Sequence, residues 1–159
     1  MQDFVHLHVH TQYSLLDGQA SVARLVDKAM KNGMKGIAVT DHGNMFGIKE
    51  FTNYVNKKNS GPKGEVKDLK KRIAGIEAGT IECEDKEAEI AACKAKIVEA
   101  ENKLFKPIIG CEMYVARRTM DLKEGKPDQS GYHLIVLAKN ETGYHNLIKL
   151  VSHAWTRGY

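Results

Sequence analysis

The chain has 159 residues, which is enough for one domain with a hydrophobic core. Its 24 basic and 20 acidic residues give a net charge of +4, which is compatible with a phosphate-bearing partner but does not require one. No apolar run approaches the ~18 residues that span a bilayer, no secretory signal precedes the first polar segment, and the three cysteines lack metal or redox spacing. We therefore expect no membrane segment, no disulfide framework and a cytoplasmic location.

Residues 4–10 are predicted to form the first strand, in which three histidines occupy every second position. Because alternate residues of a strand line one face, His6, His8 and His10 should project together. Neutral imidazole is the commonest protein ligand for transition metals, so this face is a candidate metal site. The alternative is a polar strand face whose histidines are only hydrogen-bonded. Asp17 follows in the next loop beside a glycine, either as a further ligand or as a turn former.

Helices alternate with near-continuous apolar strands along most of the remaining chain, a pattern that predicts a mainly parallel sheet or a barrel. Four strands are too few to close a barrel, so either the sheet stays open or the chain is part of a longer one. The elements predicted after the first strand are a helix over 22–32, a strand over 36–40, a helix over 45–56, a strand over 107–115, a buried strand over 131–139 and a helix over 142–154.

Polar residues follow the second predicted strand directly, in the order Thr40, Asp41, His42. Ligand sites gather at the carboxyl ends of strands in α/β folds, because the loops after the strands converge on one rim. Asp41 and His42 are therefore candidate site residues. The alternative is that Asp41 or Asn44 caps the next helix and His42 is a surface residue.

The composition changes over residues 57–104, which are dense in Glu, Lys and Ala. After a predicted loop over residues 59–64, two apolar stripes repeat at spacings of three and four and are out of phase with each other. We predict two amphipathic helices folded as a hairpin over residues 65–104. Acidic and basic residues nearly balance there, which indicates a solvated surface and not a nucleic-acid footprint. The hairpin is either a partner-docking arm or a plain surface insertion.

Two polar residues lie within the predicted strands of the C-terminal half, Glu112 and His133. Burying a carboxylate without a partner is costly, so Glu112 should be paired, exposed or bound to a metal. Imidazoles mixed with carboxylates suit Zn, Mn or Fe better than Mg or Ca alone. His145 and His153, in the last predicted helix, are expected to be surface or packing residues.

Four segments carry a resemblance to a known family: HLHVHTQYSLLDG, TDHGNMFG, KPIIGCEMYV and HLIVLAKNETGYHNLIKL. They resemble the PHP domain (polymerase and histidinol phosphatase), and the last segment especially resembles the branch found at the N-terminus of bacterial DNA polymerase III alpha subunits. The resemblance covers almost everything except residues 57–104, which it marks as an inserted helical hairpin. It implies an α/β fold of the distorted (β/α)7 barrel type, of which residues 1–159 would be the N-terminal part.

The resemblance also implies a site for up to three divalent metal ions at the carboxyl-terminal rim of the strands, holding Zn, Mn or Fe, with Mg as a further candidate. It places Asp41 and His6 beside the metal ions, in catalytic or supporting roles. The remaining ligands of the family would lie beyond residue 159, so residues 1–159 would lack part of the metal shell. An incomplete barrel would expose strand edges, which favours dimerisation or strand exchange. The implied metal ligands are His8, His10, Asp17, His42, Glu112 and His133.

The activity implied is phosphoester hydrolysis, because clustered divalent ions lower the pKa of a bound water and stabilise the attacking and leaving oxygens. On a polymerase subunit this would be a 3′–5′ exonuclease that proofreads the 3′ end of the primer strand during DNA replication, or a pyrophosphatase. Every ligand position within the chain holds a competent residue, which favours an intact site. No DNA-directed DNA polymerase (nucleotidyltransferase) activity is expected of residues 1–159 themselves.

Two other functions are open. The domain could be a non-catalytic scaffold that docks a separate proofreading exonuclease or other replisome subunits and stabilises the polymerase. It could also belong to a free-standing histidinol-phosphate phosphatase of the same superfamily, although the polymerase-like last segment argues against that reading.

Overall fold

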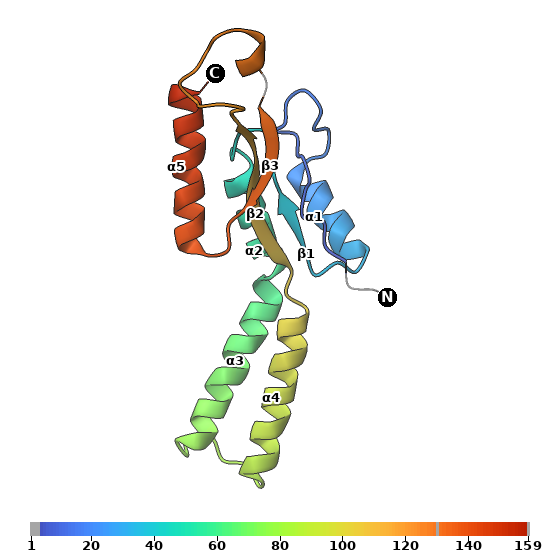
Figure 1. Ribbon diagram of the computed structural model, residues 1–159. Helices are drawn as coiled ribbons and strands as arrows, with labels where there is room; N and C mark the ends of the chain where they lie inside the picture. The colour runs from blue at the N-terminus through green and yellow to red at the C-terminus, as the bar shows by residue number, and fades with distance from the viewer. Residues whose placement is uncertain (1–3, 130, 159) are drawn as a thin grey trace. The chain divides into compact units, whose positions relative to one another are not determined.

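The computed structural model describes residues 4–129 and 131–158. The chain divides into two units (Figure 1). The first unit combines Met1–Tyr54 with Lys106–Tyr159, and the second is Val55–Phe105. The first unit contains all the residues for which a site was predicted.

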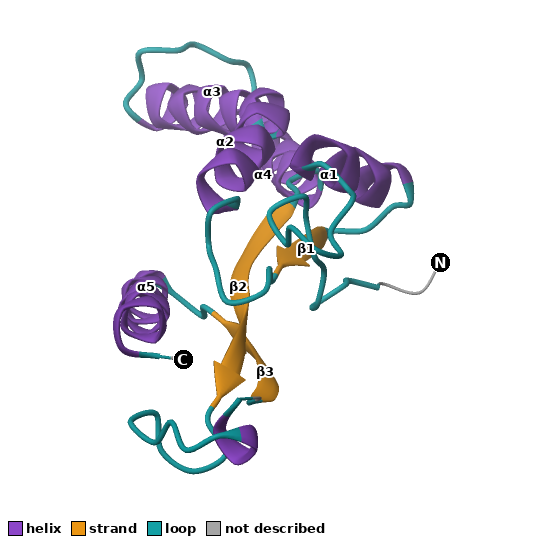
Figure 2. Cartoon of the chain, turned by 90° about the horizontal axis from the view of Figure 1, so that it is seen from above, coloured by secondary structure: helices purple, strands orange, loops and turns teal. Residues whose placement is uncertain are grey.

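Among the described residues, the first unit is built on a three-stranded sheet in the order β1 (Gly36–Val39), β2 (Lys106–Val115) and β3 (Tyr132–Leu137) (Figure 2). β1 pairs in parallel with the first half of β2, and β3 pairs antiparallel with its second half. β1 is buried along its whole length, as expected for a short, continuous apolar run. β2 therefore has a parallel neighbour along its first half and an antiparallel neighbour along its second half.

Three longer helices accompany this sheet: α1 (Val22–Lys31), α2 (Ile48–Lys58) and α5 (Glu141–Arg157). α1 begins where Ser21 accepts a hydrogen bond from the Arg24 amide, and a glycine with positive φ follows its end. α5 begins at Asn140, whose side chain accepts from the Gly143 amide. A short 3₁₀ turn, η1 (Lys126–Asp128), lies in the connection between β2 and β3.

The buried face of α5 packs on β2. Leu147 and Val151 form a cluster with Cys111, which is fully buried in the middle of β2. Cys111 is therefore a packing residue, as a small apolar side chain in a strand would be. Ile148 and Leu150 of the same helix are more than a third exposed, so the buried stripe of α5 is narrow.

The second unit is a pair of helices, α3 (Ser60–Glu77) and α4 (Lys86–Asn102), that lie side by side (Figure 1). The apolar stripes predicted for them meet between the helices, and Ile76, Cys93 and Ala100 are buried. At the open end of the pair, the Asn59 side chain exchanges two hydrogen bonds with the Phe105 backbone, at 2.8 and 2.9 Å. Two helices are thus confirmed, while their status as an insertion stays a prediction.

Residues 59–64 do not form the predicted loop, because α3 begins at Ser60. Pro62 lies in the first turn of that helix, where a missing N–H costs nothing. α2 begins at Ile48, three residues later than predicted. The delay has a local cause, since the Asn44 side chain accepts from the Phe46 amide and holds a turn there.

The predicted first strand is also wrong, because residues 4–10 lie in no regular strand. The segment runs beside β1 and accepts two hydrogen bonds, from the Ala38 amide of β1 to His6 and from the amide of Thr40, just after β1, to Val9. Regular pairing fails because the Val9 amide donates to the Thr40 hydroxyl, at 3.0 Å, and not to a backbone carbonyl.

The predicted mainly parallel sheet is corrected to a mixed one by the antiparallel pairing of β3. β3 is not fully buried either, since its first three residues are exposed. The architecture is mixed α/β, as predicted, whereas closure into a barrel stays a prediction. None of the described helices is long and apolar enough to cross a membrane.

Candidate metal centre

The candidate site lies where residues 8–10, the loop after β1 and the middle of β2 come together. His42 and Glu112 form an isolated parallel bridge that extends the β1–β2 pairing beyond the end of β1. The Glu112 amide donates to the Asp41 carbonyl at 3.1 Å, and the Gly43 amide donates to the Glu112 carbonyl at 2.9 Å. These backbone bonds fix the two side chains at neighbouring positions on one rim.

Glu112 is the centre of the cluster and is 3% exposed. One of its carboxylate oxygens, Oε2, lies 2.7 Å from His10 Nε2 and 3.0 Å from His42 Nδ1. The other oxygen, Oε1, contacts His133 Nδ1. Burial raises the pKa of Glu112, but the charge of His42 and hydrogen bonds from His10 and His133 outweigh it, so the pKa lies below its ordinary value. The buried carboxylate is therefore held in its ionised, ligand-competent form.

Asp17 completes the opposite side of the cluster from a more exposed position. Its Oδ2 lies 2.8 Å from His42 Nε2 and 3.4 Å from His10 Nδ1. The hydrogen bond from His42 lowers the pKa of Asp17 below its ordinary value. His42 thus bridges two carboxylates, one buried and one half-exposed.

His8 is oriented from behind by Thr40. His8 Nδ1 lies 2.8 Å from Thr40 Oγ1, and its other ring nitrogen, Nε2, lies 3.9 Å from Glu112 Oε2. A hydrogen bond to one ring nitrogen fixes the orientation of a histidine and leaves the other nitrogen for a metal ion. The rings of His8 and His10 are 4.7 Å apart, so these two residues do project together as predicted.

The six predicted ligands form three groups, within each of which the candidate ligand atoms lie within 4.8 Å of one another. Each pair of groups shares one residue, so the three groups form a closed triangle. Nitrogen and carboxylate oxygen donors at these spacings suit a divalent transition metal. The groups are His8–His10–Glu112, His10–Asp17–His42 and His42–Glu112–His133.

Asp41 lies beneath the cluster and belongs to none of the three groups. It is 1% exposed, and its two carboxylate oxygens accept from the Thr11 amide at 2.6 Å, the Thr11 hydroxyl at 2.8 Å and the Ser14 hydroxyl at 2.8 Å. These bonds anchor the start of the loop that carries Asp17. The geometry gives Asp41 a positioning role beneath the ligands.

His6 is likewise outside the three groups. It is exposed, and its ring packs edge-on against Phe4 with centroids 4.7 Å apart. His6 and His8 both line a separate hollow beside α1. The structure therefore brings together His8 and His10 but leaves the third histidine of the series aside.

Two residues of the centre were missed by the sequence analysis. Tyr114 places its hydroxyl 2.9 Å from His42 Nδ1, and Thr40 orients His8. Tyr114 could have been found, because it is two residues from Glu112 on a strand and so lies on the same face. Burial and the nearby Glu112 charge raise the pKa of Tyr114, which keeps its hydroxyl protonated.

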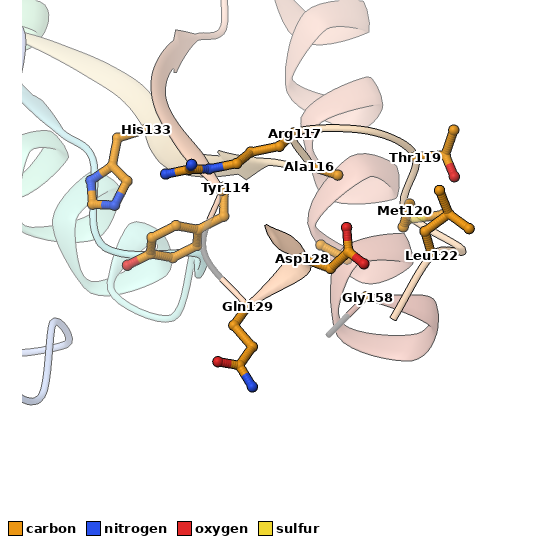
Figure 3. Close-up of a pocket in the computed structure, with 12 residues that line it drawn as sticks. Tyr114, Ala116, Arg117, Thr119, Met120, Leu122, Asp128, Gln129, His133 and Gly158 are labelled. Carbon is orange, nitrogen blue, oxygen red and sulfur yellow. The ribbon is translucent and has the colours of Figure 1, made fainter. Parts of the chain in front are cut away.

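Two hollows flank the centre, and Tyr114 borders both. Figure 3 shows the first, of about 490 Å³, where Arg117 points toward His133 and Tyr114. The guanidinium of Arg117 also lies 5.3 Å from the centre of the Tyr132 ring. The second hollow, of about 370 Å³, is lined by Asp17 and His42 together with apolar side chains.

A family model described as PHP domain matches residues 6–159, and the chain belongs to the PHP domain family. Its relatives include the DNA polymerase III subunit alpha of Treponema pallidum (40% identical over 156 residues) and that of Borreliella burgdorferi (40% over 159 residues), each covering 98% of this chain. The corresponding subunit of Aquifex aeolicus is 32% identical over 164 residues and covers 99%. The chain spans about 10% of the length of these relatives.

Proposed function

We propose that the chain is the N-terminal PHP domain of a DNA polymerase III alpha subunit and that the intact domain is a metal-dependent phosphoesterase acting as a 3′–5′ exonuclease in proofreading. The observation that supports this most directly is the triangle of three ligand groups that share His10, His42 and Glu112. Isolated exposed carboxylates are common on protein surfaces, whereas here one buried carboxylate contacts three imidazoles, and this mixture of donors is the one that binds transition metals.

In this proposal, Glu112 would serve two of the three ligand groups, because its two oxygens face different histidines. His8, His10, Asp17, His42 and His133 complete the set, while Thr40 and Asp41 hold the ligands in place. Bound divalent ions would supply a water of lowered pKa and would stabilise negative charge on both oxygens exchanged at phosphorus. Zn, Mn or Fe fits this mixed donor set best.

The proposed partners and location follow from the relatives, which are DNA polymerase III alpha subunits. The substrate is the 3′ end of a DNA strand, reached through the full-length polymerase in the cytoplasm. Other replisome subunits, a separate proofreading exonuclease among them, are further candidate partners.

The test uses the full-length protein carrying His8→Ala together with His10→Ala. Each substitution removes an imidazole from the cluster, so we expect loss of bound metal by elemental mass spectrometry and loss of 3′-terminal nucleotide release, with polymerisation retained. The matched control is His145→Ala together with His153→Ala, two exposed histidines of α5 that belong to none of the three groups. The control should retain both metal and activity.

The outcomes separate the candidate functions. Unchanged metal content in the double variant would overturn the ligand assignment. A wild-type protein that holds metal but releases no nucleotide from any 3′ end would favour the alternative function. The domain would then be a non-catalytic scaffold that docks other proteins.

A further inference from the structure

The hollow of about 370 Å³ beside the metal centre combines apolar and aromatic side chains with candidate metal ligands. Asp17 and His42 line it together with Phe46, from the loop after β1, and Trp155, from α5. Its volume is in the range of about 300–1,000 Å³ that is typical of small-molecule sites. Because Asp17 and His42 also belong to one ligand group, a molecule bound in this hollow would lie next to the metal centre.

Phe46 and Trp155 are exposed but held in place. Phe46 is 63% exposed and Trp155 is 65% exposed, values that are high for large apolar side chains. The Trp155 indole N–H donates to the Gly43 carbonyl at 2.8 Å, and the amide of Phe46 is fixed by Asn44. The two rings lie 6.0 Å apart at 45°, so they present a preformed aromatic surface. Both are therefore positioned from the same loop that carries the ligand His42.

A nucleotide consists of a flat base and an anionic phosphate, which suit the aromatic side chains and the arginine in the two hollows that border Tyr114. Its base has a flat π face, and base–aromatic stacking is the usual way in which single strands are bound irrespective of sequence. Its phosphate is anionic, and in the hollow of about 490 Å³ the Arg117 guanidinium points toward His133 and Tyr114 (Figure 3). The hollow that contains Phe46 and Trp155 and the hollow that contains Arg117 thus border the same tyrosine, which is hydrogen-bonded to the ligand His42.

We propose that Phe46 and Trp155 bind the nucleobase of the 3′-terminal nucleotide of a single strand by stacking, and so place its phosphodiester at the metal centre. This inference rests on the proposed exonuclease function and names the residues that hold its substrate. Because stacking does not read base edges, the site accepts all four bases and requires an unpaired end.

The first test compares Phe46→Ala and Trp155→Ala with wild type in the full-length protein, on a single-stranded oligonucleotide. We expect KM to rise by about 5- to 150-fold, the equivalent of the roughly 1–3 kcal/mol lost per unstacked base. kcat and metal content should stay within about two-fold, since neither residue is a candidate ligand. Trp155→Phe keeps a ring and should recover most of the affinity.

The control is Leu150→Ala, which removes another exposed apolar side chain of α5, 53% exposed, that does not line the hollow. It should leave KM unchanged. Unchanged KM in both alanine variants, in an enzyme that holds metal and releases nucleotides, would overturn the stacking site while leaving the exonuclease proposal intact.

A second test does not depend on turnover. An oligonucleotide with 5-iododeoxyuridine at its 3′ end and phosphorothioate linkages is irradiated with the full-length protein, and crosslinked peptides are mapped by mass spectrometry. Crosslinks in peptides that contain Phe46 or Trp155, lost in the alanine variants, support the site even where no hydrolysis is found. Crosslinks confined to other peptides overturn it.

Discussion

Asp41 offers the sharpest test of how the loop that carries Asp17 is held. Its buried carboxylate accepts three hydrogen bonds, two from Thr11 and one from Ser14. We predict that Asp41→Ala destabilises the protein strongly and that Asp41→Asn does so mildly. An asparagine retains one oxygen for the Thr11 amide and the Ser14 hydroxyl, which both donate to Oδ1, and loses only the acceptor of the Thr11 hydroxyl.

The expected loss of stability follows from the hydrogen-bond donors that each substitution leaves without an acceptor. A buried donor without a partner costs about 1–3 kcal/mol, and Asp41→Ala leaves three such donors. Their costs do not add fully, because the two residues share one network and can relax together. We therefore expect about 3–5 kcal/mol for Asp41→Ala and about 1 kcal/mol for Asp41→Asn. For a chain of this length, the larger value lowers Tm by roughly 6–20 °C.

Thermal and urea unfolding followed by circular dichroism measure both variants, with metal content determined on the same samples. The relative loss of stability in Asp41→Ala and Asp41→Asn decides the role of Asp41. Equal destabilisation by Asn and Ala, or a cost under about 1 kcal/mol for Ala, would refute the hydrogen-bond argument. Loss of activity in Asp41→Asn with unchanged stability and metal content would instead restore the catalytic role predicted from the sequence.

Three further predictions concern the centre and its surroundings. Glu112→Gln keeps the shape but removes the charge shared by two groups, so metal affinity should fall by more than about 100-fold in titrations with a fluorescent chelator, and a smaller loss would contradict a bridging role. Replacing residues 60–103 by a short Gly–Ser linker should leave metal content unchanged, because no described residue of α3 or α4 belongs to a ligand group; loss of metal would show that the helix pair supports the site. Asp128 has a lowered pKa because Arg118 donates to it, so its contribution to stability is present above the ordinary value of 3.8 and is lost as the pH falls through the lower folded value. The difference in urea midpoint between wild type and Asp128→Asn should therefore be constant above about pH 5 and close at lower pH, and a difference that persists in acid would contradict this origin.

Sequence patterns predicted those features that depend mainly on residues close together in the chain. The helix predicted over residues 22–32 is observed as α1, with a capping serine before it and a glycine of positive φ after it. The alternation of His8 and His10 placed both on the ligand side, although their segment is not a regular strand. Side-chain alternation needs only an extended backbone, whereas a regular strand needs a partner that offers its hydrogen bonds, and Thr40 takes one of them.

Other features depend on contacts distant in sequence. Residues 59–64 contain two glycines and a proline, yet they are helical because α3 packs along α4. The antiparallel direction of β3 was within reach of the sequence, since a parallel strand needs a crossover of a dozen residues or more, usually helical. The connection from β2 to β3 had been predicted without a helix and contains only the short turn η1.

The hydrogen bonds between Asn59 and Phe105 bear on how the chain folds. His10 and Glu112 are 102 residues apart, and closing so long a loop is slow and entropically unfavourable. The contacts between α3 and α4 join residues much nearer in sequence, so the helix pair can form first and bring residues 59 and 105 together at 2.8 and 2.9 Å. β2 then searches for β1 across a loop shortened by the whole length of the pair. We therefore expect that this long stretch of sequence, which supplies no candidate ligand, does not slow the assembly of the segments that do.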